Sequence, residues 1–413
     1  MSSILTNLTA AQVGILTTSQ IHSLTASDWG GLTTAQAAAL TSSQVQAITP
    51  STIVAISSAA INALTSSAIP GLTSAEMAGL TSAQVGALGT GSLSSTQLGA
   101  LGVSSVAGLT TSDIAALNNT QLAGLTGKEV SALNTAQIGA LTSTQVPALS
   151  TAQVGALSAG QCAALGTSLS STQIGALSAA TVGALSTAAV NALTSSQIPG
   201  LTATQMGALT SAQVGALSTG SLSSTQLGAL SATAVAGLSA GDISALSSTQ
   251  MAGLSAKEMS SLSTAQVAAF TSSQVPSLSN TQLAALTSAQ VGALNTATLT
   301  SSQLGALGVS SVAGLTTSDI AALNNTQLAG LTGKEVSALS TAQINALTTG
   351  QVPALSTADV AALTTNQVSN LSTSLLSNFS NPQLAAFAYS QVAALTSTQM
   401  AALSNSQIQS LAV

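Results

Sequence analysis

The chain has 413 residues, of which 46% are hydrophobic, 3% are charged and 1% are aromatic. A disordered chain combines low hydrophobicity with high charge, and a membrane-spanning helix needs roughly 18 consecutive apolar residues. This composition, with its frequent polar interruptions, therefore excludes both. The net charge of −6, with only three basic residues, also excludes nucleic acid as a partner, because a phosphate backbone is bound by clusters of Lys and Arg.

The N-terminal segment, residues 1–6, has no basic region and no continuous apolar core, so we expect no conventional secretory signal peptide. From Leu8 to Leu411 the sequence repeats a unit of eight residues, here called an octad, 48 times. Residues 141–164, for example, read LTSTQVPA, LSTAQVGA and LSAGQCAA. We number the slots of an octad from one to eight: Leu stands in slot one, Ser or Thr in slot two, Gln in slot five, an apolar residue in slot six, and small residues in slots seven and eight.

Each octad carries the start signal of a helix. Slots two to five read Ser/Thr-x-x-Gln, which is the capping-box pattern, and the apolar residues of slots one and six then take the two positions of a hydrophobic staple. The acidic residues support this interpretation, because a carboxylate in slot five can complete the box and lies at the positive end of the helix. All nine acidic residues stand in slot five: Asp28, Glu76, Asp113, Glu129, Asp242, Glu258, Asp319, Glu335 and Asp359.

One helix cannot run through successive octads. Eight residues at about 100° each overshoot two turns, so the leucines of slot one would wind around the helix axis instead of forming a stripe. Proline in slot seven also interrupts a helix, because it lacks an N–H and restricts the preceding residue. We predict one to two turns of α- or 3₁₀-helix per octad, followed by a bend. The slot-seven prolines are Pro70, Pro147, Pro199, Pro276 and Pro353, whereas Pro50 lies in slot three, the tolerated first helical position.

Helices this short are not stable alone, so the predicted fold class is an all-α solenoid whose stacked octads bury slots one and six. The alternative is a β-solenoid with two or three octads per coil, which the abundance of Ala and Gln disfavours. We expect a single repeat solenoid over residues 1–413. Four short units interrupt the octads, and we expect them to kink the solenoid or to mark the edges of longer modules; they lie at residues 88–92, 165–168, 217–221 and 294–298.

The sequence offers little for catalysis. His22 is the single histidine and Cys162 the single cysteine, so no metal-binding cluster and no convincing Ser-His pair can be assembled, and we expect Cys162 to fill the core. We predict that the protein is not an enzyme and has no cofactor and no metal. Three Lys-Glu dipeptides recur, each two octads after an Asp, and form either a cation or partner site or a duplicated surface pair: Lys128-Glu129, Lys257-Glu258 and Lys334-Glu335.

Four aromatic residues lie towards the two ends of the chain, and the octads become irregular near the C-terminus. Solenoids need polar caps to stay monomeric, and neither end carries a charged cap. A head-to-tail contact that does not close builds a filament, so we predict self-association through the ends. The candidate end residues are Leu8, Val13, Leu16, Trp29, Phe379, Phe387, Tyr389 and Leu411.

The LTxxQVxAL octads resemble the octapeptide-repeat tracts, rich in Thr, Ala and Gln, of large bacterial surface and adhesin-like proteins. The resemblance covers essentially the whole chain and implies an extracellular fibre or stalk. This chain departs from that pattern because it is shorter and has no calcium-binding repeats and no evident pair of haem ligands.

These features predict a structural protein: a self-associating solenoid that forms an extracellular filament, sheath or stalk. Its partner would be itself, as a homopolymer, and it would reach the cell surface without a conventional signal peptide. The alternative is an adhesin or passive binding module whose rows of Ser and Thr contact glycans or surfaces. A third hypothesis is ice binding by regularly spaced threonines.

Overall fold

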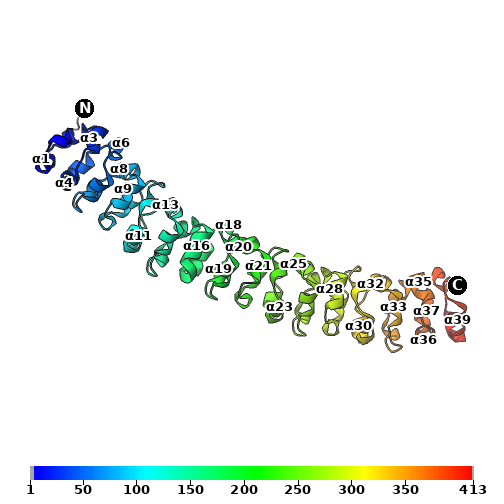
Figure 1. Cartoon of the computed structure of the whole chain (residues 1–413). Coiled ribbons are helices and arrows are strands. Elements are labelled where there is room, and N and C mark those ends of the chain that lie inside the picture. The colour runs from blue at the N-terminus through cyan, green and yellow to red at the C-terminus, as the bar shows by residue number, and fades with distance from the viewer. Residues whose placement is uncertain (1–3, 412–413) are drawn as a thin grey trace. The chain divides into compact units, whose positions relative to one another are not determined.

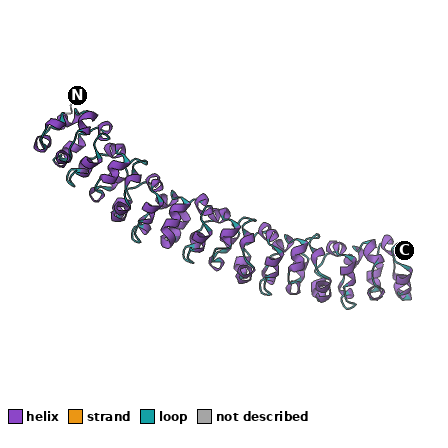
Figure 2. Cartoon of the chain, viewed as in Figure 1, coloured by secondary structure: helices purple, strands orange, loops and turns teal. Residues whose placement is uncertain are grey.

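The structure is a computed structural model that describes residues 4–411, and within this range all regular structure is helical (Figure 2). The chain divides into two compact halves, Met1–Gln205 and Met206–Val413. Each half is an all-α solenoid of short helices, which confirms the predicted fold class. The β-solenoid alternative is wrong, since no strand occurs in the described residues.

Forty α-helices of four to seven residues lie within residues 4–411, one in each of forty octads (Figure 1). The first twenty are α1 (Ala10–Gly14), α2 (Thr18–His22), α3 (Ala26–Gly30), α4 (Thr34–Ala38), α5 (Ser42–Gln46), α6 (Pro50–Ile53), α7 (Ser58–Asn62), α8 (Ser74–Gly79), α9 (Ser82–Ala87), α10 (Ser95–Leu98), α11 (Thr111–Ala116), α12 (Asn119–Leu122), α13 (Gly127–Ala132), α14 (Thr135–Gly139), α15 (Thr151–Gly155), α16 (Ala159–Leu165), α17 (Ser171–Ala176), α18 (Ala179–Gly183), α19 (Thr187–Asn191) and α20 (Ala203–Ala208). The others are α21 (Ser211–Val214), α22 (Ser224–Leu227), α23 (Ala240–Ala245), α24 (Ser248–Met251), α25 (Ala256–Ser261), α26 (Thr264–Ala268), α27 (Asn280–Ala284), α28 (Ser288–Ala293), α29 (Ser301–Leu304), α30 (Thr317–Ala322), α31 (Asn325–Leu328), α32 (Gly333–Ala338), α33 (Thr341–Asn345), α34 (Thr357–Ala361), α35 (Thr365–Ser369), α36 (Thr373–Leu376), α37 (Asn381–Ala385), α38 (Tyr389–Ala393), α39 (Ser397–Ala401) and α40 (Asn405–Ser410).

The capping box starts most of these helices. In α5, Thr41 N–H donates to Gln44 Oε1 at 2.9 Å and Gln44 N–H donates to Thr41 Oγ1 at 3.3 Å. Each box satisfies donors that the first helical turn leaves free. The staple residues of this octad, Leu40 and Val45, are both buried, so the local signal seen in the sequence sets where the helix begins.

Eight octads replace the α-helix by a turn followed by a 3₁₀-helix in slots six to eight. Five of them contain the slot-seven proline, and the other three read Val-Ala-Gly in these slots. Proline is tolerated at the start of such a turn because its missing N–H would have no partner there. These 3₁₀-helices are η2 (Ile69–Gly71), η4 (Val106–Gly108), η5 (Val146–Ala148), η7 (Ile198–Gly200), η9 (Val235–Gly237), η10 (Val275–Ser277), η12 (Val312–Gly314) and η13 (Val352–Ala354).

Three consecutive units make one coil of the solenoid. In each half the helices that contact one another are three units apart: α1 contacts α4, α4 contacts α7, and α26 contacts α28. Figure 1 shows α1 beside α4 and α6 beside α8 at the N-terminal end. The sequence did not determine how many octads form one coil, and this contact pattern gives three units per coil.

The slot-five glutamines join successive coils. The Nε2 of Gln44 donates to the carbonyls of Val13 at 2.9 Å and Leu16 at 2.8 Å, which lie 31 and 28 residues earlier. In the C-terminal half, Gln266 donates in the same way to Val235 at 3.0 Å and Leu238 at 2.7 Å. One glutamine thus caps its own helix with its oxygen and binds the preceding coil with its nitrogen. Because both ends of the amide are used, the side chain is buried without an unpaired polar atom.

Each short unit forms one turn of 3₁₀-helix and takes the place of an octad in its coil. The helix α9 before the first short unit, for instance, contacts η4 three units later. The short units therefore interrupt the period of the sequence and keep the three-unit coil. Their 3₁₀-helices are η3 (Thr90–Ser92), η6 (Gly166–Ser168), η8 (Thr219–Ser221) and η11 (Thr296–Thr298), and one further 3₁₀-helix, η1 (Leu5–Asn7), precedes the first octad.

Candidate functional site

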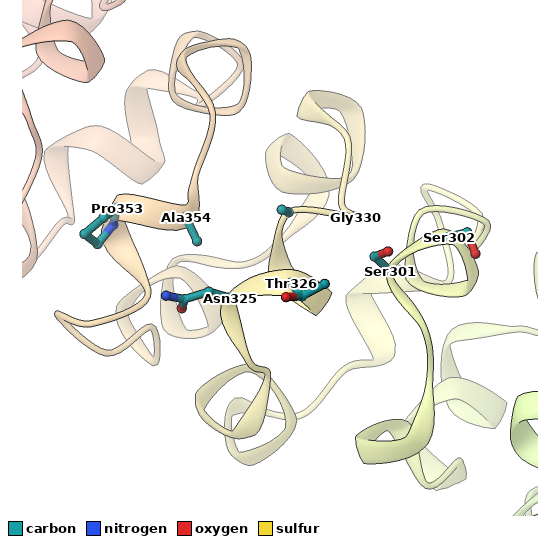
Figure 3. Close-up of a pocket in the computed structure, with 8 residues that line it drawn as sticks. Ser301, Ser302, Asn325, Thr326, Gly330, Pro353 and Ala354 are labelled. Carbon is teal, nitrogen blue, oxygen red and sulfur yellow. The ribbon is translucent and has the colours of Figure 1, made fainter.

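An open groove in the C-terminal half has a volume of about 710 Å³. It crosses three successive coils, because Ser301, Asn325 and Pro353 belong to α29, α31 and η13, and each of these helices contacts the next. Figure 3 shows Asn325 and Thr326 between Pro353 and Ser301, with all of these side chains around one opening. The lining residues are Ser301, Ser302, Asn325, Thr326, Ala329, Gly330, Pro353 and Ala354.

Gly330 allows the coils to approach one another closely beside this groove. A Cβ atom on Gly330 would lie 2.0 Å from the carbonyl oxygen of Ser301, a distance that no side chain tolerates. Glycine is therefore required in slot eight of this octad, because the backbone of the preceding coil occupies the space of a side chain.

A second polar groove recurs in both halves. In the N-terminal half it has a volume of about 590 Å³ and is lined by Gly91, Ser92, Leu93, Ser94, Ser95, Asn118, Asn119, Thr120 and Gln121. Its counterpart in the C-terminal half, of about 540 Å³, is lined by Ala297, Leu299, Thr300, Ser301, Asn324, Asn325, Thr326 and Gln327. The two sets come from copies of the same sequence module. Hydroxyl and amide groups can exchange hydrogen bonds with a neutral polar molecule, and no charged side chain lines these grooves.

The aspartate octads pair with the short units. Thr90 Oγ1 donates to Asp113 Oδ1 at 3.1 Å, and Thr219 Oγ1 donates to Asp242 Oδ1 at 2.8 Å. Thr296 binds Asp319 in the same way, so each of these carboxylates bonds with the short unit one coil earlier. The sequence contains a signal for this pairing, because each of these Asp octads follows its short unit by three units. That spacing indicates a contact only once the coil is known to contain three units.

Hydrogen bonds outweigh burial at Asp242. Burial opposes ionisation of this carboxyl, but the hydroxyl and N–H of Ser239 and the hydroxyl of Thr219 donate to it and lower its pKa. At Asp28, the hydroxyl of Thr25 and the N–H of Ile4 lower the pKa of the carboxyl in a comparable arrangement. These carboxylates act as structural acceptors.

The Lys-Glu dipeptides separate into two environments. Lys257 is exposed, whereas Glu258 is buried, and neighbouring residues in a helix do not face each other. Burial raises the pKa of the Glu258 carboxyl, whose Oε1 is buried without a hydrogen-bond partner. Burial also raises the pKa of Glu335, and the nearby charge of Asp359 adds to this effect. The glutamates therefore take the slot of the coil-joining glutamines, while the lysines lie exposed beside them.

Most of the predicted end residues lie inside their own coils. Val13, Trp29, Phe379, Phe387 and Leu411 are buried, and the Phe379 and Phe387 rings meet edge to face at 6.1 Å. Leu8 and Leu16 are half-buried. Tyr389 is 75% exposed, and two apolar residues that the sequence analysis did not single out, Ile15 and Ile408, are 81% and 38% exposed.

The two residues considered for chemistry lie apart. His22 is exposed at the end of α2, and the hydroxyl of its neighbour Ser23 donates to the carbonyl of Gln20. Cys162 is buried, and burial raises the pKa of its thiol to about 11. Within residues 4–411 no group of three or more His, Cys, Asp or Glu side chains is placed to hold a metal ion.

Comparisons with known proteins agree with the repeat architecture. None of the described helices has both the length and the apolar character to cross a bilayer. The comparison with curated proteins found no match. The ALTTAQ repeat family matches residues 53–90, 106–143, 114–151, 130–167, 168–203, 259–296, 312–349, 320–357 and 336–373. These segments cover more than half of the chain, and they follow the same octads that form the coils; the chain therefore belongs to the ALTTAQ repeat family.

Proposed function

We propose that this repeat solenoid is a structural protein that associates head to tail into a filament or stalk at the cell surface. The observation that supports the proposal is the direction of the bonds between coils. Each coil donates through glutamine amides to the coil before it and accepts through backbone carbonyls from the coil after it. The two edges of any coil are therefore complementary.

Among the described residues, both kinds of edge keep groups that no other coil engages, and these groups could bind a second copy. Gln12 and Gln20 are exposed, and their amide nitrogens have no partner among the described residues. At the other edge, Gln407 donates to the carbonyls of Ser377 and Phe379. The carbonyls of Leu384 and Phe387 lie one octad later in the sequence, and no glutamine among the described residues donates a hydrogen bond to them.

Association would also cover apolar surface. Ile15 in the first octad and Ile408 in the last are among the exposed large hydrophobic residues of the described chain. Burying apolar surface contributes roughly 25 cal/mol per Å², and the low charge of the chain offers little repulsion between copies. A contact between the two different edges is heterologous and propagates when it does not close.

The test is the oligomeric state of the 413-residue polypeptide, measured by light scattering and negative-stain electron microscopy at rising concentration. We expect concentration-dependent linear assemblies. The double variant Gln12→Glu/Gln20→Glu keeps the helix caps but replaces the amide donors with carboxylates, so it should remain monomeric.

The control is Thr18→Glu, which adds a negative charge at an exposed position of α2 and leaves its capping residues Thr17 and Gln20 unchanged. It should assemble like the unmodified chain. A chain that stays monomeric at every concentration, or a double variant that still assembles, would refute the proposal.

A second candidate function, binding of neutral glycans, is favoured by the polar groove that recurs in the two halves. Its exposed amides, Asn119 and Asn325, occupy equivalent positions in α12 and α31. Calorimetry with neutral oligosaccharides should detect binding that is lost in Asn119→Ala/Asn325→Ala and kept in Asn366→Ala, an exposed asparagine outside the grooves. Absence of binding to the unmodified chain removes this candidate.

A further inference from the structure

The short unit at residues 165–168 differs from the other three. Thr90, Thr219 and Thr296 are buried and bind an aspartate one coil later. The corresponding Thr167 is exposed. The octad three units after it has Ala189 in slot five, where the other short units meet an aspartate. Neither the threonine–aspartate bond nor a glutamine side chain fills this part of the coil.

The backbone also takes a different course at this unit. The helix α16 continues for seven residues to Leu165, and Gly166 then turns with φ of +57°, the one positive φ among the described residues. The left-handed region is open to glycine without strain. The short unit supplies four residues where a full octad supplies eight, so less of the chain fills this part of the coil.

A cavity of about 320 Å³ occupies this space within the N-terminal half. Its floor consists of the buried side chains of Cys162, Leu169, Ile174 and Leu177. At its mouth Leu185 and Leu193 are half-exposed, whereas the same slot is buried at Leu177 and Leu201. The remaining lining residues are Ala163, Gly166, Ser186, Ala188, Ala189 and Ala192.

The lining selects for apolar molecules. Ser186 and Cys162 are its only side chains with a polar or thiol group, and no charged side chain lines the cavity. A water molecule needs two to four polar partners to be held in a cavity, and apolar cavities of roughly 150 Å³ stay dry and bind benzene. This cavity is about twice that size and falls within the range of about 300–1,000 Å³ of small-molecule sites.

We propose that this cavity is a binding site for a small, neutral, hydrophobic molecule of the size of a fused aromatic ring pair. The molecule enters between Leu185 and Leu193 and lies against Cys162, Leu169 and Ile174. This site is independent of the association of the two ends, because all of its residues belong to units inside the N-terminal half.

The single cysteine of the chain reports on the site. Because the thiol of Cys162 lines the cavity floor, a bound molecule should shield it from alkylation. We would measure the rate at which iodoacetamide modifies Cys162 in the full chain at increasing concentrations of naphthalene. The rate should fall severalfold and saturate, while naphthalene-2-sulfonate at the same concentrations should leave it unchanged, because the lining offers no partner for a charge.

A filling variant tests the location. Ala189→Leu places a larger side chain in the cavity and should abolish the protection by naphthalene, whereas Ala180→Leu, an exposed position in α18 outside the lining, should preserve it. Circular dichroism establishes that both variants fold. The proposal is overturned if naphthalene gives no protection in the unmodified chain, if the sulfonate protects equally, or if folded Ala189→Leu is protected like the control. If Ala189→Leu does not fold, the comparison of the two probes on the unmodified chain decides.

Discussion

The hydroxyl of Thr219 donates a 2.8 Å hydrogen bond to the carboxylate of Asp242, which lies one coil later in the solenoid. The same bond joins Thr90 to Asp113. In an ordinary octad, slot five holds a glutamine that donates to backbone carbonyls of the preceding coil. At these two places the unit one coil earlier is short and presents a hydroxyl donor, so an acceptor replaces the amide. The residue type in slot five thus depends on whether the preceding coil offers hydrogen-bond acceptors or a donor.

Removal of the Thr219 hydroxyl tests this pairing. Hydrogen bonds to charged groups contribute about 1.5–3 kcal/mol, and Asp242 is partly exposed, so Thr219→Val should cost about 1 kcal/mol in urea unfolding at pH 7. In the Asp242→Asn background the same substitution should cost less, which a double-mutant cycle measures. Equal costs in both backgrounds would show that the hydroxyl and the carboxylate are not coupled.

The pH dependence of this pair has a defined sign. The folded-state pKa of Asp242 lies below the ordinary value of 3.8. The contribution of its bonds is therefore fully present above that ordinary value and is lost as the pH falls through the lowered folded-state pKa. The difference between Thr219→Val and the unmodified chain should shrink in this acidic window.

The coil-joining role of glutamine is separable from its role in the helix cap. Gln44 is buried and donates to Val13 and Leu16, whereas Gln20 caps α2 but binds no preceding coil among the described residues. Loss of a cap costs about 0.5–2 kcal/mol, and each buried carbonyl left without its donor adds about 1–3 kcal/mol. Gln44→Ala should therefore destabilise the N-terminal half by at least about 2 kcal/mol more than Gln20→Ala.

The emission of the single tryptophan provides the measurement. Trp29 is buried at 1% exposure between these two octads, so its fluorescence follows the unfolding of the first coils in urea. Similar costs for the two substitutions would mean that the interactions between coils contribute little and that the local cap dominates.

Glu258 stands in a slot built for an amide. Its Oε2 accepts from the N–H of Ser255 at 2.6 Å, as a capping glutamine does, but its buried Oε1 has no partner. In the neighbouring octads, Gln250 and Gln266 have an amide nitrogen at the position equivalent to this atom. Each of these nitrogens donates to a carbonyl of the preceding coil. A charged carboxylate in this slot meets acceptors, whereas a protonated carboxyl can donate like the amide.

Glu258→Gln should therefore stabilise the C-terminal half by about 1–2 kcal/mol at neutral pH. Burial raises the folded-state pKa of Glu258 above its ordinary value of 4.5, so the folded state binds the proton more tightly than the unfolded state. The penalty of the charged form is fully present above the raised pKa and is relieved as the pH falls towards 4.5. Measured by urea unfolding, the stability gained in Glu258→Gln should therefore disappear as the pH falls from the raised pKa towards 4.5.

The reverse exchange is the control for this prediction. Gln266→Glu, one octad later, should destabilise at pH 7 and recover as the medium becomes acidic, because Gln266 makes the two carbonyl bonds that Glu258 cannot make when charged. A pH-independent effect of either exchange would contradict the role assigned to the proton.

The helices could be predicted from the sequence because their cause is local. The Ser/Thr-x-x-Gln box and the staple lie within one octad, and helices such as α5 begin at the slot that this pattern indicates. The partners of Gln44 lie 28 and 31 residues away, and no local pattern gives the number of octads per coil. For the same reason the link between Asp113 and residues 88–92, and the cavity around Cys162, became visible only when the coils were placed.

The slot-eight glycines give a test of the distance between coils. At Gly330 an added Cβ would meet the carbonyl oxygen, carbonyl carbon and Cα of Ser301 at 2.0, 2.6 and 2.7 Å. These are backbone atoms, so no side-chain rotation relieves the clash and the coils must separate. Since overpacking typically costs about 1–3 kcal/mol, Gly330→Ala should destabilise the C-terminal half by about 2 kcal/mol. At Gly220, in η8, a Cβ meets nothing within 4 Å, so Gly220→Ala should be neutral or stabilise by about 0.4–1 kcal/mol through the unfolded chain. Urea unfolding of the two variants separates the steric clash from the general effect of losing a glycine. Equal changes in the free energy of unfolding would mean that the space between the coils admits a methyl group at position 330.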